Sequence, residues 1–114
     1  MTQEDKELLL KDICSRLPFG VKVQDTYYKS LEPAPIWLLD LNAQCVRLFA
    51  DEGYQNIEYI KPYLFPMSQV VEEIVTTSNK HIAVNVDFFH KNHIDYRGLI
   101  PKGLALDATG LNIY

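Results

Sequence analysis

The hydrophobic pattern of this chain changes its period at Pro18-Phe19-Gly20, and this change constrains the fold more than any other feature. Ahead of it, apolar residues recur at the spacing of one helix face: Leu10, Ile13, Cys14 and Leu17, with Leu8 and Leu9 beside them. That spacing predicts a helix at about residues 3–17 with one apolar stripe. Thr2 and Asp5 have the spacing of a capping box, and Pro18 ends the helix.

Beyond this point, short apolar runs alternate with turn residues, which is typical of strands in a small sheet. Residues 21–24 alternate apolar and polar side chains, as in a half-buried strand. Two further strands are predicted at 36–39 and 44–49, with a hairpin turn near Asn42 between them, and a last one at 56–60. We therefore predict an antiparallel meander of about three or four strands.

The second half of the chain is predicted to be mainly helical. Two prolines hold residues 61–68 extended, and their apolar neighbours predict that this segment lies across the core. Ser68 is a suitable N-cap for a helix at 69–77. Apolar residues at helical spacing predict a second helix at 81–92, although its β-branched residues leave a strand as the alternative.

These elements predict an α+β fold in which the N-terminal helix packs on a small antiparallel β-sheet. A C-terminal helical half closes the other side of the same core. The chain has 114 residues, of which 47% are hydrophobic and 23% charged. This length suits one domain covering residues 1–114, because a single domain typically takes about 100–150 residues.

The charge balance argues against nucleic acid as a partner, and the lengths of the apolar runs argue against a membrane. Eleven Lys and Arg face fifteen Asp and Glu, for a net charge of −4, and no basic cluster is present. No apolar run approaches the about 20 residues that a membrane helix needs. The polar, acidic start of the chain is unlike a signal peptide, so we expect a cytoplasmic protein.

Two cysteines, Cys14 and Cys45, fall on the predicted helix stripe and in a predicted strand. Free cysteine usually behaves as a small buried hydrophobe, so both are predicted to be reduced, buried thiols. A disulfide between them is the alternative, although nothing in the sequence marks an oxidising compartment.

Three stretches of the chain together suggest a family. They are residues 1–21, which open with MTQEDKELLLKD, the central KPYLFPMS at 61–68, and 92–106, which begin NHIDYRGLI. In these stretches the chain resembles a group of small uncharacterised proteins from gut bacteria and from their phages and prophages. The resemblance implies a cytoplasmic bacterial or phage-associated protein. It supplies no catalytic residue and no cofactor.

Asp87, His90 and His93 are the only group with the spacing of metal ligands. On a helix, Asp87 and His90 lie one turn apart, as do His90 and His93, and both residue types are ordinary zinc ligands. The third ligand would converge only if the helix ended near Asn92. The alternative interpretation is a solvated helix face, and we predict no cofactor.

Arg97, in the run Asp95-Tyr96-Arg97-Gly98, is a second candidate. A guanidinium can clamp a carboxylate or a phosphate through two parallel hydrogen bonds. The structural alternative, which we favour, is that Arg97 pairs with Asp95, Asp87 or a helix-end carbonyl and so pins the tail to the body.

Aromatic residues suggest an interaction surface. Seven Tyr and one Trp occur in the chain, and both types are enriched at binding interfaces. Four of the tyrosines fall in or beside the predicted sheet: Tyr27, Tyr28, Tyr54 and Tyr59. They either form an exposed aromatic surface or belong to the edge of the core.

The leading functional hypothesis is a small binding or adaptor protein that acts through contacts with a protein partner. No Gly-rich phosphate loop, Gly-x-Ser-x-Gly elbow, Cys-x-x-Cys pair or His-Glu-x-x-His motif occurs, which disfavours an enzyme. One alternative is a metal-dependent or small-molecule enzyme with its site around Asp87, His90, His93 and Arg97. Another is a homo-oligomeric structural protein.

Overall fold

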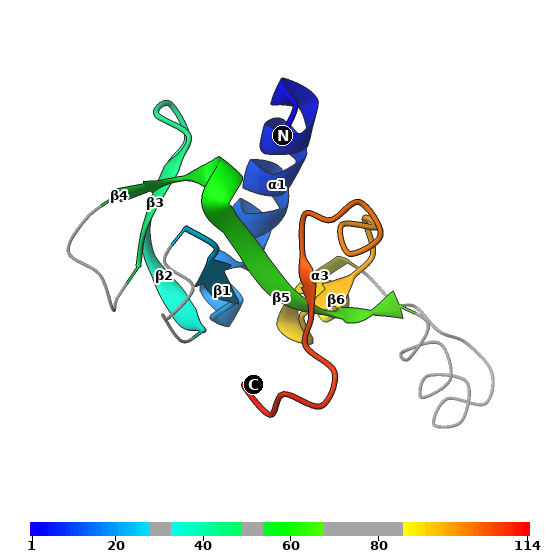
Figure 1. Ribbon diagram of the computed structural model, residues 1–114. Helices are drawn as coiled ribbons and strands as arrows, with labels where there is room; N and C mark the ends of the chain where they lie inside the picture. The colour runs from blue at the N-terminus through cyan, green and yellow to red at the C-terminus, as the bar shows by residue number, and fades with distance from the viewer. Residues whose placement is uncertain (28–32, 49–53, 68–85) are drawn as a thin grey trace, which may run out of the picture.

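The computed structural model describes residues 1–27, 33–48, 54–67 and 86–114 (Figure 1). The helices are α1 (Gln3–Arg16) and α3 (Val86–Lys91), and the single-turn 3-10 helices are η1 (Leu17–Phe19) and η2 (Ile57–Tyr59). The strands are β1 (Lys22–Asp25), β2 (Ala34–Asp40), β3 (Cys45–Leu48), β4 (Tyr54–Asn56), β5 (Ile60–Pro66), β6 (Ile94–Asp95) and β7 (Leu106–Asp107).

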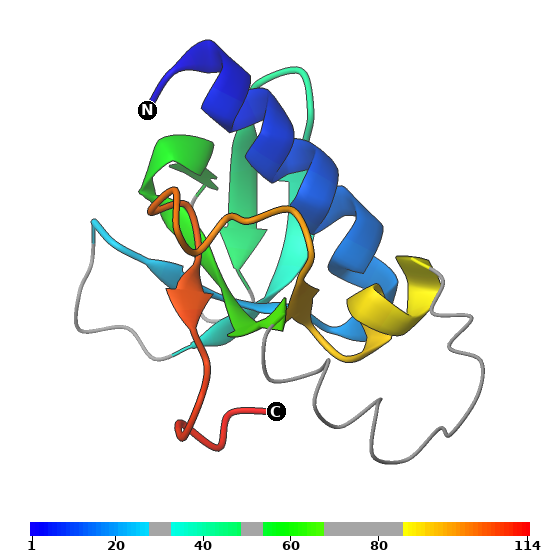
Figure 2. The same ribbon diagram turned by 90° about the vertical axis from the view of Figure 1, so that its right-hand side faces the viewer.

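The strands form one mixed sheet in the order β4-β3-β2-β1-β5-β6, with β7 also paired to β5. The strands from β1 to β5 pair antiparallel, whereas β6 and β7 run parallel to β5. The sheet curls, because β4 comes back within reach of β1 although two strands lie between them in the order: the side chain of Gln55 on β4 donates a 3.3 Å hydrogen bond to Asp25 on β1. Helix α1 lies across the sheet (Figure 2).

The predicted C-terminal helical half is wrong, and so is the prediction of a purely antiparallel sheet of three or four strands. Within the described residues the sheet has seven strands, and the C-terminal region described there contains one helix of six residues, Val86–Lys91. Strands of two residues, such as β6 and β7, carry no alternating pattern that a sequence could reveal. The helix predicted at 69–77 lies outside the described residues.

Helix α1 begins and ends almost where its pattern predicted. Thr2 caps it, since its Oγ1 accepts a 3.1 Å hydrogen bond from the Asp5 amide and Asp5 accepts one from the Thr2 amide. Its buried face differs from the predicted stripe, because it includes two charged residues and leaves Cys14 exposed. The buried residues of α1 are Leu9, Leu10, Asp12, Ile13 and Arg16.

The prediction of buried thiols was therefore wrong for Cys14, and Cys45 is half-buried. Both cysteines are free thiols in this structure, so the alternative of a disulfide between them is not formed. The buried face of the helix is rotated about the helix axis relative to the predicted stripe, because Asp12 and Arg16 form an ion pair with each other inside the protein.

Other predicted segments were confirmed or shifted. The hairpin turn near Asn42 joins β2 to β3, where the Asp40 carboxylate accepts hydrogen bonds from the Asn42 and Ala43 amides. The extended segment at 61–68 corresponds to β5, whose residues are mostly buried. A strand at 56–60 was wrong, since β4 ends at Asn56 and a 3-10 turn follows.

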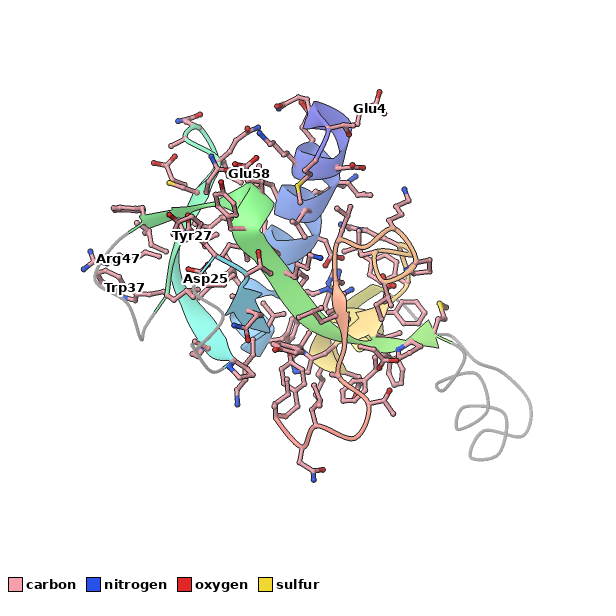
Figure 3. All side chains as sticks on the ribbon, in the orientation of Figure 1. Glu4, Asp25, Tyr27, Trp37, Arg47 and Glu58 are labelled. Carbon is pink, nitrogen blue, oxygen red and sulfur yellow. The ribbon has the colours of Figure 1, made fainter. Side chains whose placement is uncertain are left out.

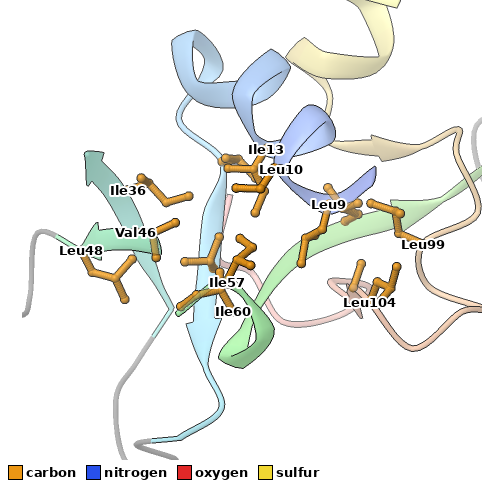
Figure 4. Packing of buried hydrophobic residues seen from close by; sticks show 14 of the residues in the cluster. Leu9, Leu10, Ile13, Ile36, Val46, Leu48, Ile57, Ile60, Leu99 and Leu104 are labelled. Carbon is orange, nitrogen blue, oxygen red and sulfur yellow. The ribbon is translucent and has the colours of Figure 1, made fainter. Parts of the chain in front are cut away.

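One hydrophobic cluster lies between α1 and the curled sheet (Figure 4). Leu9, Leu10 and Ile13 of α1 contribute from one side, and Val23 and Val46 from strands on the other. Further members come from η2, β5 and the C-terminal segment: Ile57, Ile60, Leu64, Leu99 and Leu104. The C-terminal segment therefore completes the core without forming a helical layer.

The last residues are held against the sheet by the Tyr114 hydroxyl. It accepts a 2.8 Å hydrogen bond from the Lys22 amide and donates one of 2.7 Å to the Tyr63 carbonyl oxygen. Lys22 Nζ also donates to the Ile113 carbonyl oxygen at 2.5 Å. These bonds join the tail to the paired strands β1 and β5.

Replacing Tyr114 with phenylalanine is expected to lower the free energy of unfolding by about 1–2 kcal/mol, because two backbone groups lose their partner. Urea unfolding of both proteins measures the difference. Tyr54→Phe is the matched control, since the Tyr54 side chain is exposed, and we expect a change within about 0.5 kcal/mol. Equal losses in the two variants would contradict the role given to the Tyr114 hydroxyl.

Candidate functional site

The outer face of β2, β3 and β4 exposes large apolar side chains around one arginine. In the strand register, Leu38 pairs with Arg47, and Arg47 pairs with Tyr54. These three side chains share a face, since Val46, next to Arg47, is buried on the opposite one. The pairing of β2 with β3 shifts between Ile36 and Leu38, so Trp37 sits in a β-bulge.

The bulge explains why Trp37 is also on this face. A bulge sets two residues of one strand against one residue of its partner, and it re-aims the side chain of the extra residue. Trp37 and Leu38 together therefore oppose Arg47. We call the four residues Trp37, Leu38, Arg47 and Tyr54 the aromatic surface.

Arg47 lies between two rings in the aromatic surface. Its Cζ is 4.4 Å from the Trp37 ring centroid and 5.9 Å from that of Tyr54. Trp37 is 53% exposed, Tyr54 57% and Leu38 43%. In Figure 3, Trp37 and Arg47 lie together at the edge of the molecule formed by β2, β3 and β4. Apolar groups of this size usually mark a contact site when they gather on one face.

Arg47 has no negatively charged partner among the described residues. Nε of Arg47 is shielded from solvent and has no hydrogen-bond acceptor among the described residues. No Asp or Glu in the described part of the chain lies within 4.0 Å of the Arg47 guanidinium. Asp40 is on the same face, but its carboxylate accepts from the hairpin amides. Together with burial, Asp40 raises the pKa of the neighbouring Cys45 thiol.

The four predicted tyrosines do not form one group. Tyr54 belongs to the aromatic surface, whereas Tyr27 and Tyr59 contact each other edge to face with ring centroids 5.3 Å apart. The Tyr27 amide donates a 2.9 Å hydrogen bond to the carboxylate of Asp25, the last residue of β1. Tyr28 lies outside the described residues. The negative charge of Glu58 raises the pKa of the Tyr59 phenol.

Sequence reasoning missed Trp37 and Arg47. Alternation along β3 places Arg47 on the face opposite Val46, but the sequence shows neither the β3–β4 register that sets Arg47 beside Tyr54 nor the bulge in β2. Strict alternation cannot place both Trp37 and Leu38 on the outer face, because neighbouring residues of a regular strand point to opposite faces.

Arg97 contacts Asp12 of α1, with 3.6 Å between its Nη1 and Oδ1 of the carboxylate. Its guanidinium also lies over the Tyr96 ring, 4.9 Å from the centroid. Asp95, one of the partners considered for Arg97, instead accepts hydrogen bonds from the Leu99 and Ile100 amides, each 2.8 Å long. Arg97 thus joins the C-terminal segment to α1.

Arg16 makes the stronger connection between the same elements. Its Nε and Nη2 donate to the two carboxylate oxygens of Asp12 at 2.8 and 3.1 Å, and both side chains are fully buried. Nη2 also donates to the Ile94 carbonyl oxygen at 2.6 Å. The cluster of Asp12, Arg16 and Arg97 therefore fastens the C-terminal segment to the N-terminal helix.

The two histidines of the predicted metal group have different neighbours. Nε2 of His90 lies 2.8 Å from the Tyr96 hydroxyl oxygen. The His93 ring is stacked on Tyr114, with centroids 3.7 Å apart. The side chain of Asp87 lies outside the described part of the structure. Within the described residues, no three His, Cys, Asp or Glu side chains are grouped so that they could hold a metal ion.

His93 is buried at an unusual backbone position. Its φ of 57° is left-handed, and its Nδ1 has no hydrogen-bond partner in the described part of the chain. Burial lowers the pKa of His93 to about 4, with help from the positive charges of Arg16 and Lys22. Burial likewise raises the pKa of Tyr114 to about 12. The stacked pair is therefore neutral over the usual pH range.

A groove of about 520 Å³ runs between α1 and the hairpin turn that joins β2 to β3. Cys14 and Lys11 line it from the helix, and Leu41 and Gln44 from the turn. Its lining mixes apolar and polar groups, but no buried charged side chain is directed into it. The groove therefore indicates no particular chemistry.

None of the helices in the described ranges is both long and apolar enough to cross a membrane. Compared with protein-family models, with curated proteins and with solved structures, the chain matches none of them. The aromatic surface is therefore the feature from which a function is inferred.

Proposed function

We propose that this chain is a protein-binding module and that its partner docks on the aromatic surface. The observation that supports this proposal is the cluster of Trp37, Leu38 and Tyr54, each more than 40% exposed, around a stacked arginine. Trp, Tyr and Arg are the residue types that most often dominate the binding energy of interfaces. An adaptor of a bacterium or phage is the biological role that we propose with it.

Selection from a random dodecapeptide phage-display library tests the proposal. The purified protein is the bait, and selected peptides are synthesised and titrated by isothermal calorimetry. We expect Trp37→Ala and Tyr54→Ala each to weaken binding about 10- to 30-fold, since interface aromatics often contribute about 1.4–2 kcal/mol or more.

Leu111→Ala is the matched control, because Leu111 is 49% exposed but lies far along the chain in the C-terminal tail. Circular dichroism and urea unfolding of each variant establish that the fold is kept. The proposal fails if the selected peptides bind the two aromatic variants and the wild type equally well.

A second copy of this chain is the rival occupant of the surface, as a homo-oligomeric structural protein would require. Sedimentation velocity at micromolar concentrations distinguishes the two. A monomer supports docking of a different protein, whereas a dimer that Trp37→Ala dissociates would overturn it.

A further inference from the structure

We infer that the segment docking on the aromatic surface presents an Asp or Glu carboxylate to Arg47, beside an apolar side chain that packs on Trp37. This inference rests on the proposed function, which it deepens by naming the chemistry of the partner. The partner is thus a short acidic and apolar peptide segment of another protein.

The first step is the unmet donor of Arg47. Its Nε is shielded from solvent without an acceptor, and no carboxylate of the described residues lies within 4.0 Å of the guanidinium. Leaving a shielded N–H donor without an acceptor is unfavourable. Because the guanidinium forms no ion pair within the described residues, a carboxylate that approaches its terminal Nη groups displaces no existing partner and supplies the charge that Arg47 lacks.

The second step is the orientation of the guanidinium. Its Cζ lies over two aromatic rings, 4.4 Å from the Trp37 centroid and 5.9 Å from that of Tyr54. The N–H donors of arginine lie in the plane of the group and point to its edge. The contacts with the two rings therefore hold the guanidinium in place without using its N–H donors. A carboxylate can then accept hydrogen bonds from two of these donors side by side.

The third step is the number of charges. Arg47 is the only basic residue in β2, β3 and β4, and Asp40 stands on the same face. One cation next to one anion suits a single carboxylate better than a polyanion, whose neighbouring phosphates Asp40 would repel. Single-stranded nucleic acid also stacks on exposed aromatic rings, and it is the competing ligand class.

The experiment uses the peptides selected on the wild-type protein. We expect them to share an Asp or Glu next to an aromatic or large aliphatic residue. The strongest binder is then synthesised in two forms, one with the acid and one with the matching amide, Asn or Gln. Both are titrated against the wild type, Arg47→Met and Arg47→Lys.

Arg47→Met is expected to weaken binding of the acidic peptide about 10- to 100-fold, the range for a hydrogen bond to a charged group. It should change binding of the amide peptide less than about threefold. Arg47→Lys keeps the charge but loses the planar donors, so an intermediate loss is expected. Urea unfolding of both variants establishes that they are folded.

The outcomes separate the inference from the function on which it rests. If binding depends on Trp37 but Arg47→Met weakens both peptide forms equally, the carboxylate inference is wrong and the docking surface stands. If no selected peptide depends on Trp37, the proposed function itself fails. Binding of a dodecathymidine strand more tightly than the acidic peptide, and its loss in Arg47→Met, would overturn the inference in favour of nucleic acid.

Discussion

Replacing Arg16 with methionine is expected to lower the free energy of unfolding by about 3–5 kcal/mol, the usual cost of removing one partner of a buried ion pair. The substitution leaves the fully buried Asp12 carboxylate without the two hydrogen bonds that it accepts from Arg16. It also frees the Ile94 carbonyl oxygen, so the C-terminal segment loses its main polar connection to α1. Small domains are stable by only about 5–15 kcal/mol, so this loss is a large part of the total.

Urea unfolding followed by circular dichroism measures this change. Lys11→Met is the matched control, because Lys11 is an exposed cation on the same helix, and a change within about 0.5 kcal/mol is expected. Removing both charges with Asp12→Leu and Arg16→Met together should restore part of the lost stability, since the Asp12 carboxylate is no longer buried without Arg16. The recovery is incomplete, because Arg97 then loses Asp12, its ion-pair partner. A loss in Arg16→Met no larger than in Lys11→Met would contradict the burial of the pair.

The buried ion pair of Asp12 and Arg16 is the feature of α1 that the sequence did not predict. The start, the end and the capping box of the helix followed from local patterns, and the structure confirms them. Asp12 and Arg16 are four residues apart, a spacing typical of exposed ion pairs on a helix surface. Their burial depends on two carbonyl oxygens that accept hydrogen bonds from Arg16 and belong to a segment more than seventy residues away. No local pattern contains that information, so the predicted stripe was turned toward Cys14.

The two shortest strands of the sheet could not be predicted from the sequence either. Strands β1 and β2 and the hairpin turn could be predicted, because alternation and turn residues are local signals. Strands β6 and β7 consist of two residues each, and they exist only because β5 offers backbone groups to them. The glycines between them, Gly98 and Gly103, adopt positive φ and set the turns.

The aromatic surface was predicted in part, through Tyr54. Its remaining members depend on tertiary features: the β-bulge lets the neighbouring residues Trp37 and Leu38 both face outward, and the cross-strand register places Arg47 between the Trp37 and Tyr54 rings. Tyr27 and Tyr59 were grouped with Tyr54 because all three are near strands, but Tyr27 and Tyr59 contact each other, whereas Tyr54 contacts Arg47 on the outer face of β3 and β4. Composition alone thus indicated an aromatic contact surface without its location.

The protein is expected to lose stability as the pH falls from about 6.5 toward about 4, because His93 is buried in its neutral form. In the unfolded chain, histidine has a pKa near 6.5, so the unfolded state binds this proton first. Between the two pKa values, protonation therefore favours unfolding. A pKa of about 4 in the folded state makes the full contribution of this group about 3 kcal/mol, which is present above about pH 6.5.

Urea unfolding at a series of pH values between about 7.5 and 4.5 measures this loss, and His93→Phe isolates it. Phenylalanine keeps a ring that can stack on Tyr114 but binds no proton. Its strain at a φ of 57° lowers stability by an amount that does not depend on pH. The other titrating groups are the same in both proteins, so the difference between the two curves reports His93 alone. As the pH falls, the free energy of unfolding of the wild type should decrease more than that of His93→Phe. If the free energies of both proteins change in parallel with pH, His93 is not buried in its neutral form.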